Sequence, residues 1–221
     1  LAEAMERACP GAYLLPPDVA SGAASSCDVL LASPLGSPRV SAMLAAPGLR
    51  WVHVLGTGVD AFPLQLVPPQ VMLSCSRGAS GVPIAEWVLA MMLAFEKHLP
   101  QSWISAPPAQ MWRADLGSLA GRTLGLAGFG GIGAAVARRA AAFDMRVLAL
   151  ARSPRETAPA GVEMVGSHEA LLDCADHLVL ALPLTPATRH FIDAGPLARA
   201  NPGVRLVNVA RGALVDQEAL R

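Results

Sequence analysis

The stretch that decides the fold is "LGLAGFGGIGAAVARRAAAFDMRVLALARSP", residues 124–154. An apolar run ends in a glycine-rich turn, an alanine-rich segment follows, and a second apolar run closes the unit. This order predicts a strand, a helix over about residues 134–143 and a second strand. The turn, Gly128-Phe129-Gly130-Gly131-Ile132-Gly133, fits the pattern G-x-G-x-x-G, and its place between strand and helix is typical of a dinucleotide-binding fingerprint.

Each glycine of this turn has a separate physical task in such a site. Gly128 permits the tight turn, Gly130 lets the backbone approach a pyrophosphate, and Gly133 allows the helix to pack closely on the sheet. The N–H groups at the helix start, those of Gly131 and Ile132 among them, would bind the anion with the positive end of the helix dipole. The alternative is an ordinary glycine-rich turn that binds nothing.

The end of the second strand indicates which dinucleotide is bound. In an NAD site a carboxylate about twenty residues after the turn binds the adenine ribose hydroxyls. Here the chain has Arg152, Ser153 and Arg155 instead. Guanidinium groups pair with phosphate, so Arg152 and Arg155 would bind a 2′-phosphate and Ser153 would donate a hydrogen bond to it. We therefore expect NADP(H) to be preferred, with NAD possible if Arg152 is only a solvated loop arginine.

Composition excludes several other classes of protein. The 221 residues carry a formal net charge of zero and are 53% apolar, which suits one or two globular domains and argues against a nucleic-acid partner. The most apolar stretch, residues 87–95, is shorter than the roughly 20 residues of a membrane span and is expected to be a buried helix. Four cysteines without C-x-x-C spacing, and no secretory signal, predict a cytoplasmic protein with reduced thiols and no metal site.

The rest of the chain predicts an α/β protein with two domains. Strand-like runs alternate with helical segments, which is typical of a parallel sheet. We expect a first domain over 1–78 and a second over 79–221, with a long helix over about 82–98 after the boundary. Expected strands are residues 28–33, 49–55, 71–76, 123–128, 146–151, 177–182 and 205–210. Helices are also expected at residues 1–8 and from residue 216 onward, so that the chain is interpreted as a fragment.

Five motifs in this order give the chain a family resemblance: "GTGVD" (56–60), "PIAEWVLAMML" (83–93), "LAGRTLGLAGFGGIG" (119–133), "LPLTPATRHFID" (182–193) and "VNVARGALVD" (207–216). The chain resembles the D-isomer-specific 2-hydroxyacid dehydrogenases, especially the glyoxylate/hydroxypyruvate reductase branch. The resemblance implies a Rossmann-type dinucleotide-binding domain, a smaller flavodoxin-like substrate domain, both incomplete, and a homodimer of the full-length protein. The dimer helix would be the one from Val82, whose Trp87, Met91, Met92 and Phe95 are either interface or core.

The same resemblance implies residue roles. Arg211 would bind the carboxylate of a 2-oxo or 2-hydroxy acid and polarise the reacting carbonyl; a fixed guanidinium stabilises the developing oxyanion but does not lose a proton. Backbone amides in the first domain would also bind the substrate carboxylate, those of Thr57, Gly58 and Val59. Further cofactor contacts would lie on the adenosine side and at the nicotinamide amide, made by Pro183, Thr185 and Ala210.

One part of the family's machinery is not matched. The glutamate and the histidine that acts as general acid lie beyond the arginine motif, and none of the five histidines corresponds to it; only His53, in a strand next to the substrate loop, is a candidate, whereas His190 is expected to be solvated. The leading hypothesis is an NADPH-dependent 2-oxoacid reductase, inactive as a fragment. The alternatives are a cofactor-binding, corepressor-like module and a truncated product without function.

Overall fold

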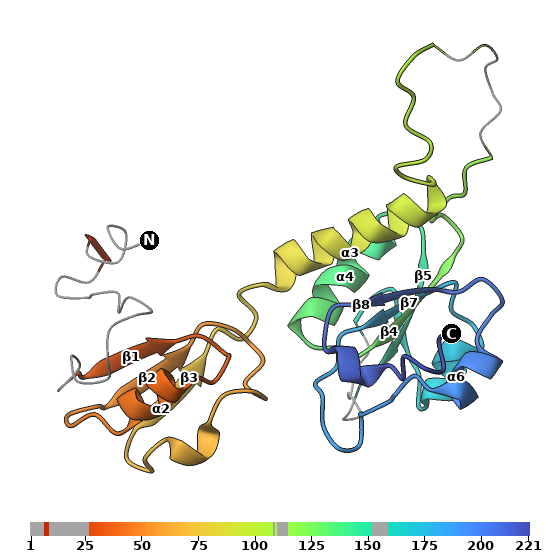
Figure 1. Ribbon diagram of the computed structural model, residues 1–221. Helices are drawn as coiled ribbons and strands as arrows, with labels where there is room; N and C mark the ends of the chain where they lie inside the picture. Colours follow the sequence, from red (N-terminus) through yellow and green to blue (C-terminus); the bar gives the residue numbers. More distant parts are fainter. Residues whose placement is uncertain (1–6, 9–26, 108, 110–114, 152–158) are drawn as a thin grey trace. The chain divides into compact units, whose positions relative to one another are not determined.

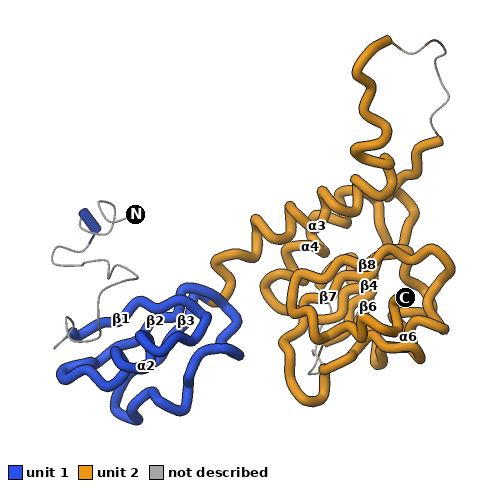
Figure 2. The backbone as a smooth tube through the Cα atoms, viewed as in Figure 1, with its two compact units in different colours: residues 1–76 blue, residues 77–221 orange. Residues whose placement is uncertain are grey.

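The computed structural model describes residues 7–8, 27–107, 109, 115–151 and 159–221 (Figure 1). Arg152, Ser153 and Arg155 lie outside the described residues, as does the expected helix 1–8 apart from its last two residues, which are helical. The chain divides into two compact units, residues 1–76 and 77–221 (Figure 2), and each is considered by itself.

The first unit contains a parallel sheet with the strand order β1-β2-β3. Its strands are β1 (Val29–Ala32), β2 (Trp51–Val54) and β3 (Met72–Cys75), with helix α2 (Pro38–Leu44) between the first two. Helix α2 begins where it does because the Ser37 side chain accepts a hydrogen bond from the Val40 amide and proline occupies the first helical position. The three strands follow in chain order, so the flavodoxin-like arrangement stays a prediction.

The second unit contains a five-stranded parallel sheet with the order β6-β5-β4-β7-β8. Its strands are β4 (Thr123–Ala127), β5 (Arg146–Leu150), β6 (Val162–Met164), β7 (His177–Leu180) and β8 (Arg205–Asn208). The chain starts in the middle of the sheet, adds two strands on one side, and returns to add two on the other. This is the strand order of a Rossmann fold, with its reversal between β4 and β7, and the predicted fold class is confirmed.

Helices cover both faces of this sheet, so its central strands β4 and β7 are buried on both sides, as is typical of parallel strands. Figure 1 shows α3 (Gly81–Glu96) and α4 (Gly131–Ala141) side by side over one face. Leu124 and Leu126 of β4 pack into that layer. Between them Gly125 faces the other layer, where α5 (His168–Leu172) and α6 (Ala194–Arg199) contribute to the core. An added Cβ at Gly125 would lie 2.9 Å from the Ala175 Cβ, so this layer packs directly on the strand.

The structure corrects several predicted boundaries. Helix α3 ends at Glu96 rather than His98, because His98 has a left-handed φ of 52° and Pro100 follows two residues later. Helix α4 starts at Gly131, inside the glycine motif, rather than at residue 134. Residues 217–220 form turns, not a helix. Four short elements were not predicted: helices α2, α5 and α6, although Ser37, Ser167 and Asp193 cap their starts, and strand β6.

The prediction that residues 87–95 form a buried helix was half right. Within this stretch Val88, Leu89 and Met92 are buried, whereas Trp87 is 51% and Phe95 42% exposed. One side of α3 therefore belongs to the core of the second unit, and the other presents large apolar side chains.

Candidate functional site

The described residues among the predicted cofactor residues lie at one edge of the second unit, where its parallel strands end. The glycine turn follows β4, the segment with Pro183 and Thr185 follows β7, and Ala210 and Arg211 follow β8. Strand order reverses between β4 and β7, and open α/β sheets bind their ligands outside the carboxyl ends of the strands at such a reversal. The topology thus brings three of the five sequence motifs to a single edge.

The loops after β4 and β7 touch through their backbones. Gly128 has a φ of +103°, and an added Cβ would lie 2.7 Å from the carbonyl carbon and oxygen of Ala181. The Ala181 amide donates to the Ala127 carbonyl at 2.8 Å, so the pairing of the two strands continues to this point. Only glycine fits at position 128, both for its conformation and for space.

The start of α4 leaves open space in front of it. Gly130 is the N-cap residue and has no side-chain capping hydrogen bond. An added Cβ at Gly130 would meet nothing within 4 Å, whereas one at Gly133 would collide with the Gly128 carbonyl oxygen. The glycines therefore differ: Gly128 and Gly133 are needed by the fold of the turn, and Gly130 is not. The first N–H groups of a helix, which have no partner within it, open onto this space.

The loop after β7 is organised by a residue that the sequence analysis missed. The Thr188 hydroxyl donates to the Pro183 carbonyl at 2.7 Å and accepts from the Thr185 amide at 2.7 Å. Since its single proton is used, the Thr185 hydroxyl, 3.0 Å away, is the donor in the contact between the two side chains. Threonines three residues apart in "TPAT" were the available signal for such a turn.

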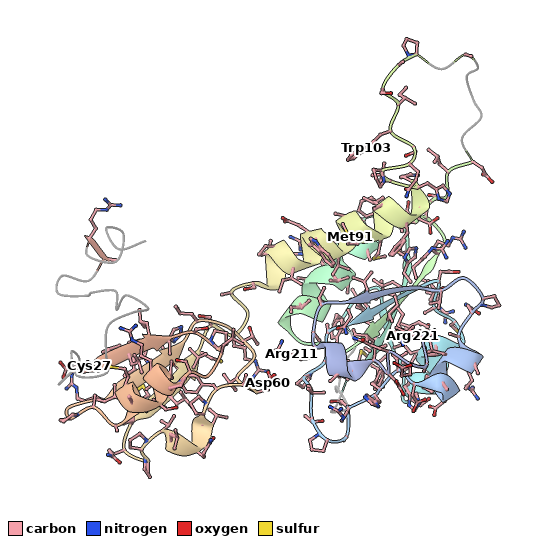
Figure 3. All side chains as sticks on the ribbon, viewed as in Figure 1. Cys27, Asp60, Met91, Trp103, Arg211 and Arg221 are labelled. Carbon is pink, nitrogen blue, oxygen red and sulfur yellow. The ribbon has the colours of Figure 1, made fainter. Side chains whose placement is uncertain are left out.

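Arg211 lies three residues beyond β8 and is half-buried (Figure 3). Its Nη1 donates to the Ala210 carbonyl at 3.0 Å. The side chain of Asn208, also missed, holds the backbone of this loop: its Oδ1 accepts from the Ala210 amide at 3.0 Å and its Nδ2 donates to the Arg211 carbonyl at 2.8 Å. A short polar side chain that bonds the backbone two and three residues on is typical of a tight turn.

The predicted substrate loop, residues 57–59, follows β2 in the first unit. Thr57 is exposed and its hydroxyl contacts the Ser76 carbonyl at 3.4 Å, while Val59 packs against the core of that unit. Next to this loop, His53 has both ring nitrogens engaged: Nδ1 with the Ser74 hydroxyl and Nε2 with the Ser76 hydroxyl, each at 2.9 Å. His53 thus links neighbouring side chains of one sheet.

The other histidines have varied surroundings. His177 is fully buried, with its Nε2 3.0 Å from the Glu96 Oε1, and burial lowers its pKa below the ordinary value, outweighing the carboxylate. His190 is partly exposed, 4.0 Å from the Asp216 carboxylate. Within the described ranges no three His, Cys, Asp or Glu side chains are grouped to hold a metal ion, and Cys27, Cys75 and Cys174 are unpaired. No helix in the described part of the chain is long and apolar enough to cross a membrane.

Comparison with known proteins connects this fold and site to one family. Residues 89–221 match the NAD binding domain of the D-isomer specific 2-hydroxyacid dehydrogenases. The chain is 34% identical over 196 residues to a hydroxypyruvate reductase of Thermotoga maritima, covering 87% of this chain and 63% of the relative. It is also 34% identical over 203 residues to a D-3-phosphoglycerate dehydrogenase of Mycobacterium tuberculosis, covering 90% of this chain and 38% of that protein.

The solved structures agree. A D-lactate dehydrogenase from Aquifex aeolicus, complexed with NAD and lactic acid, superposes with a TM-score of 0.73 at 26% identity and covers 92% of this chain and 62% of that one. The chain thus spans less than two thirds of the length of these relatives. The match of its second unit, the Rossmann strand order and the glycine turn together show that the chain belongs to the D-isomer specific 2-hydroxyacid dehydrogenase family.

Proposed function

We propose that the protein is an oxidoreductase that interconverts a 2-oxo acid and a D-2-hydroxy acid with a nicotinamide dinucleotide. One observation carries the proposal: the uncapped glycine turn after β4 and Arg211 after β8 open onto the same edge of one sheet. Only β7 separates the two strands, so they lie about 10 Å apart at ordinary strand spacing. A dinucleotide bound at the turn and extended along the edge would bring its nicotinamide toward Arg211.

The residues present fit such a cofactor. The space before Gly130 and the N–H groups of the first turn of α4 would hold the pyrophosphate. Pro183 and Thr185, fixed by Thr188, would lie along the adenosine, and Ala210 at the nicotinamide amide. The bound cofactor would supply the hydride.

Arg211 would bind the substrate carboxylate and stabilise negative charge on the carbonyl oxygen, because a guanidinium offers two parallel donors and keeps its charge. It does not give up a proton, so the reduction needs a separate acid. Within the described residues His53 is engaged by two serines and His177 is buried, so neither is proposed as this acid. For the first unit, the proposal is that the backbone amides of Thr57, Gly58 and Val59 bind a substrate carboxylate.

A glycine pair tests the cofactor site. Gly130→Ala adds a methyl group that meets no protein atom within 4 Å and lies in the space proposed for the pyrophosphate. Stability should therefore be unchanged, while affinity for the dinucleotide should fall at least about tenfold, equivalent to about 1.4 kcal/mol. Gly133→Ala pushes against the Gly128 carbonyl and should lower stability as well. Thermal unfolding and fluorescence titration with NADH and NADPH give both quantities. Undiminished binding by Gly130→Ala would refute this site.

Arg211 is tested in the product of the complete coding sequence with glyoxylate and hydroxypyruvate. Arg211→Ala should raise KM and lower kcat together, and Arg211→Lys should restore only part of the loss, because an ammonium does not reproduce the planar pair of donors. Unchanged kcat/KM in Arg211→Ala would overturn the proposed role.

NADP(H) is further proposed to be the preferred cofactor, with NAD(H) also possible. Support comes from the sequence after β5, where Arg152, Ser153 and Arg155 stand in place of a carboxylate. A charged hydrogen bond to a 2′-phosphate contributes about 1.5–3 kcal/mol, or roughly ten- to a hundredfold in affinity. A cytoplasmic location and the absence of nucleic-acid or membrane partners remain predictions from composition.

A homodimer through α3 is also proposed. Large apolar side chains are exposed along this helix and the loop after it, where Figure 3 labels Trp103: Trp87 (51%), Phe95 (42%), Trp103 (73%) and Ile104 (73%). Trp87 and Phe95 are eight residues apart and so lie on the same side of the helix, whereas Met91 between them is half-buried and packs against the core. Large exposed apolar side chains on one side of a helix support an interface between proteins.

A further inference from the structure

We propose that Asn208, the last residue of β8, is the positioning residue for Arg211. This inference rests on the proposed role of Arg211 as the group that binds the substrate carboxylate. The observation is that the Asn208 side-chain amide makes two hydrogen bonds to the backbone of the loop, one with the Ala210 N–H and one with the Arg211 carbonyl.

Only a primary amide can make this pair of bonds. The Asn208 Oδ1 accepts from the Ala210 amide at 3.0 Å, and its Nδ2 donates to the Arg211 carbonyl at 2.8 Å. An aspartate could accept but not donate, and a serine hydroxyl does not have two atoms to span both partners. The Arg211 carbonyl also accepts from the Leu214 amide at 3.1 Å, so two donors share it.

The far end of the loop is fixed to the core. Leu214 is fully buried, and its carbonyl accepts from the Ile192 amide at 3.0 Å. On the near side, the Val209 amide donates to the Leu180 carbonyl at 3.2 Å and continues the sheet. Between these two hydrogen bonds the Asn208 side chain bonds the backbone of the turn at Ala210 and Arg211. The backbone that carries Arg211 is therefore fixed at both ends before any substrate arrives.

Fixing this backbone matters because the arginine side chain is long and flexible, so the position of its guanidinium depends on where the backbone holds the base of the side chain. The half-buried guanidinium of Arg211 already donates to the Ala210 carbonyl. Asn208 in turn holds Ala210, because its side chain accepts from the Ala210 amide. A shift of the turn would move both the base of the side chain and this intramolecular acceptor. A misplacement of about 1 Å at a reacting group can cost roughly a hundredfold in rate.

The test uses the product of the complete coding sequence, with glyoxylate as substrate and saturating cofactor. Asn208→Asp keeps the acceptor but turns a carboxylate oxygen toward the Arg211 carbonyl, so kcat/KM should fall about ten- to a hundredfold, with the KM for glyoxylate raised. Asn201→Asp is the matched control, because Asn201 donates to the Ala175 carbonyl before β8, at the opposite edge of the sheet. Its kcat/KM should stay within about twofold.

A double-mutant cycle separates positioning from general stability. If Asn208 acts through Arg211, Asn208→Asp should cause less than about twofold further loss of kcat/KM in an Arg211→Ala background. An equal loss in both backgrounds would overturn the proposal. If Arg211→Ala itself leaves kcat/KM unchanged, the proposed function is what fails, and the positioning role fails with it.

Hydrogen exchange tests the geometry without the reaction. The Ala210 amide, which donates to the Asn208 Oδ1, should exchange faster in Asn208→Ala, with amides within β7 and β8 unchanged. Protection of the Ala210 amide that is the same in Asn208→Ala as in wild type would show that Asn208 does not hold the turn, whatever substrate the enzyme uses.

Discussion

The buried pair of Glu96 and His177 should stabilise the second unit, and Glu96→Ala should show by how much. Glu96 ends α3 at 8% exposure, and His177 begins β7 with no exposed surface. A carboxylate only accepts, so the His177 Nε2, 3.0 Å away, is the donor. No described residue forms a hydrogen bond with the His177 Nδ1, so the contact with Glu96 is the one side-chain hydrogen bond described for this buried ring.

The magnitude follows from what the substitution leaves behind. Glu96→Ala leaves the buried His177 Nε2–H without its acceptor, and a hydrogen bond to a charged group contributes about 1.5–3 kcal/mol to stability. In a chain of 221 residues each kcal/mol moves Tm by roughly 2–4 °C, so Tm should fall by about 3–12 °C. Glu96→Gln keeps an acceptor in place and should lose about 1 kcal/mol or less.

Thermal unfolding followed by circular dichroism at pH 7.5 measures these effects. Gly166→Ala is the control, because an added Cβ there meets nothing within 4 Å. Gly117→Ala should resemble a milder Glu96→Ala, since its methyl group would displace the Glu96 carboxylate. Equal Tm values for Glu96→Gln and Glu96→Ala would refute the assignment of the stabilisation to the hydrogen bond.

The same pair gives stability a pH dependence whose sign is fixed. Burial lowers the pKa of His177 in the folded protein, and the neighbouring Arg205 adds to this, against the opposing charges of Glu96 and Asp176. In the unfolded chain histidine takes up a proton near pH 6.5, so below that pH the unfolded state binds more protons and stability falls. The Tm of the wild type should therefore decrease between pH 7.5 and 5.5 more steeply than that of His177→Gln, which cannot titrate. Parallel curves would contradict this.

Three further outcomes are expected. In titrations with both cofactors, the wild type should bind NADPH at least about tenfold more tightly than NADH, and Arg152→Ala should remove most of that difference; equal wild-type affinities would exclude the NADP preference. Trp87→Glu should convert the homodimer to a monomer in sedimentation velocity, whereas Leu220→Glu, which replaces an equally exposed apolar side chain, should not; a monomeric wild type contradicts the dimer. Gly125→Ala should destabilise by about 1–3 kcal/mol in denaturant unfolding, since its methyl group would overlap Ala175, and full stability there would contradict the packing described.

The sequence by itself determined the fold class, the positions of the described strands other than β6, and the glycine turn. These features are local: apolar runs of strand length, alternation with alanine-rich segments, and glycines at fixed spacing follow from backbone conformation and from burial on both faces of a parallel sheet. The same local signals failed at element ends. Helix α4 begins among the glycines, where propensity opposes a helix, because packing on the sheet and the turn geometry decide the start.

Only the tertiary structure decided which of these residues work together. It sorted α3 into a core side with Met92 and an exposed side with Trp87, which composition leaves open. It paired Glu96 with His177, 81 positions apart, and it distinguished Gly130, which has space around it, from Gly133, which has none. It also brought the Asn208 side chain to the Ala210 amide and the Arg211 carbonyl, with which it forms hydrogen bonds. Contacts between distant segments and the direction of single hydrogen bonds depend on how the elements pack, and packing leaves no periodic pattern in the sequence.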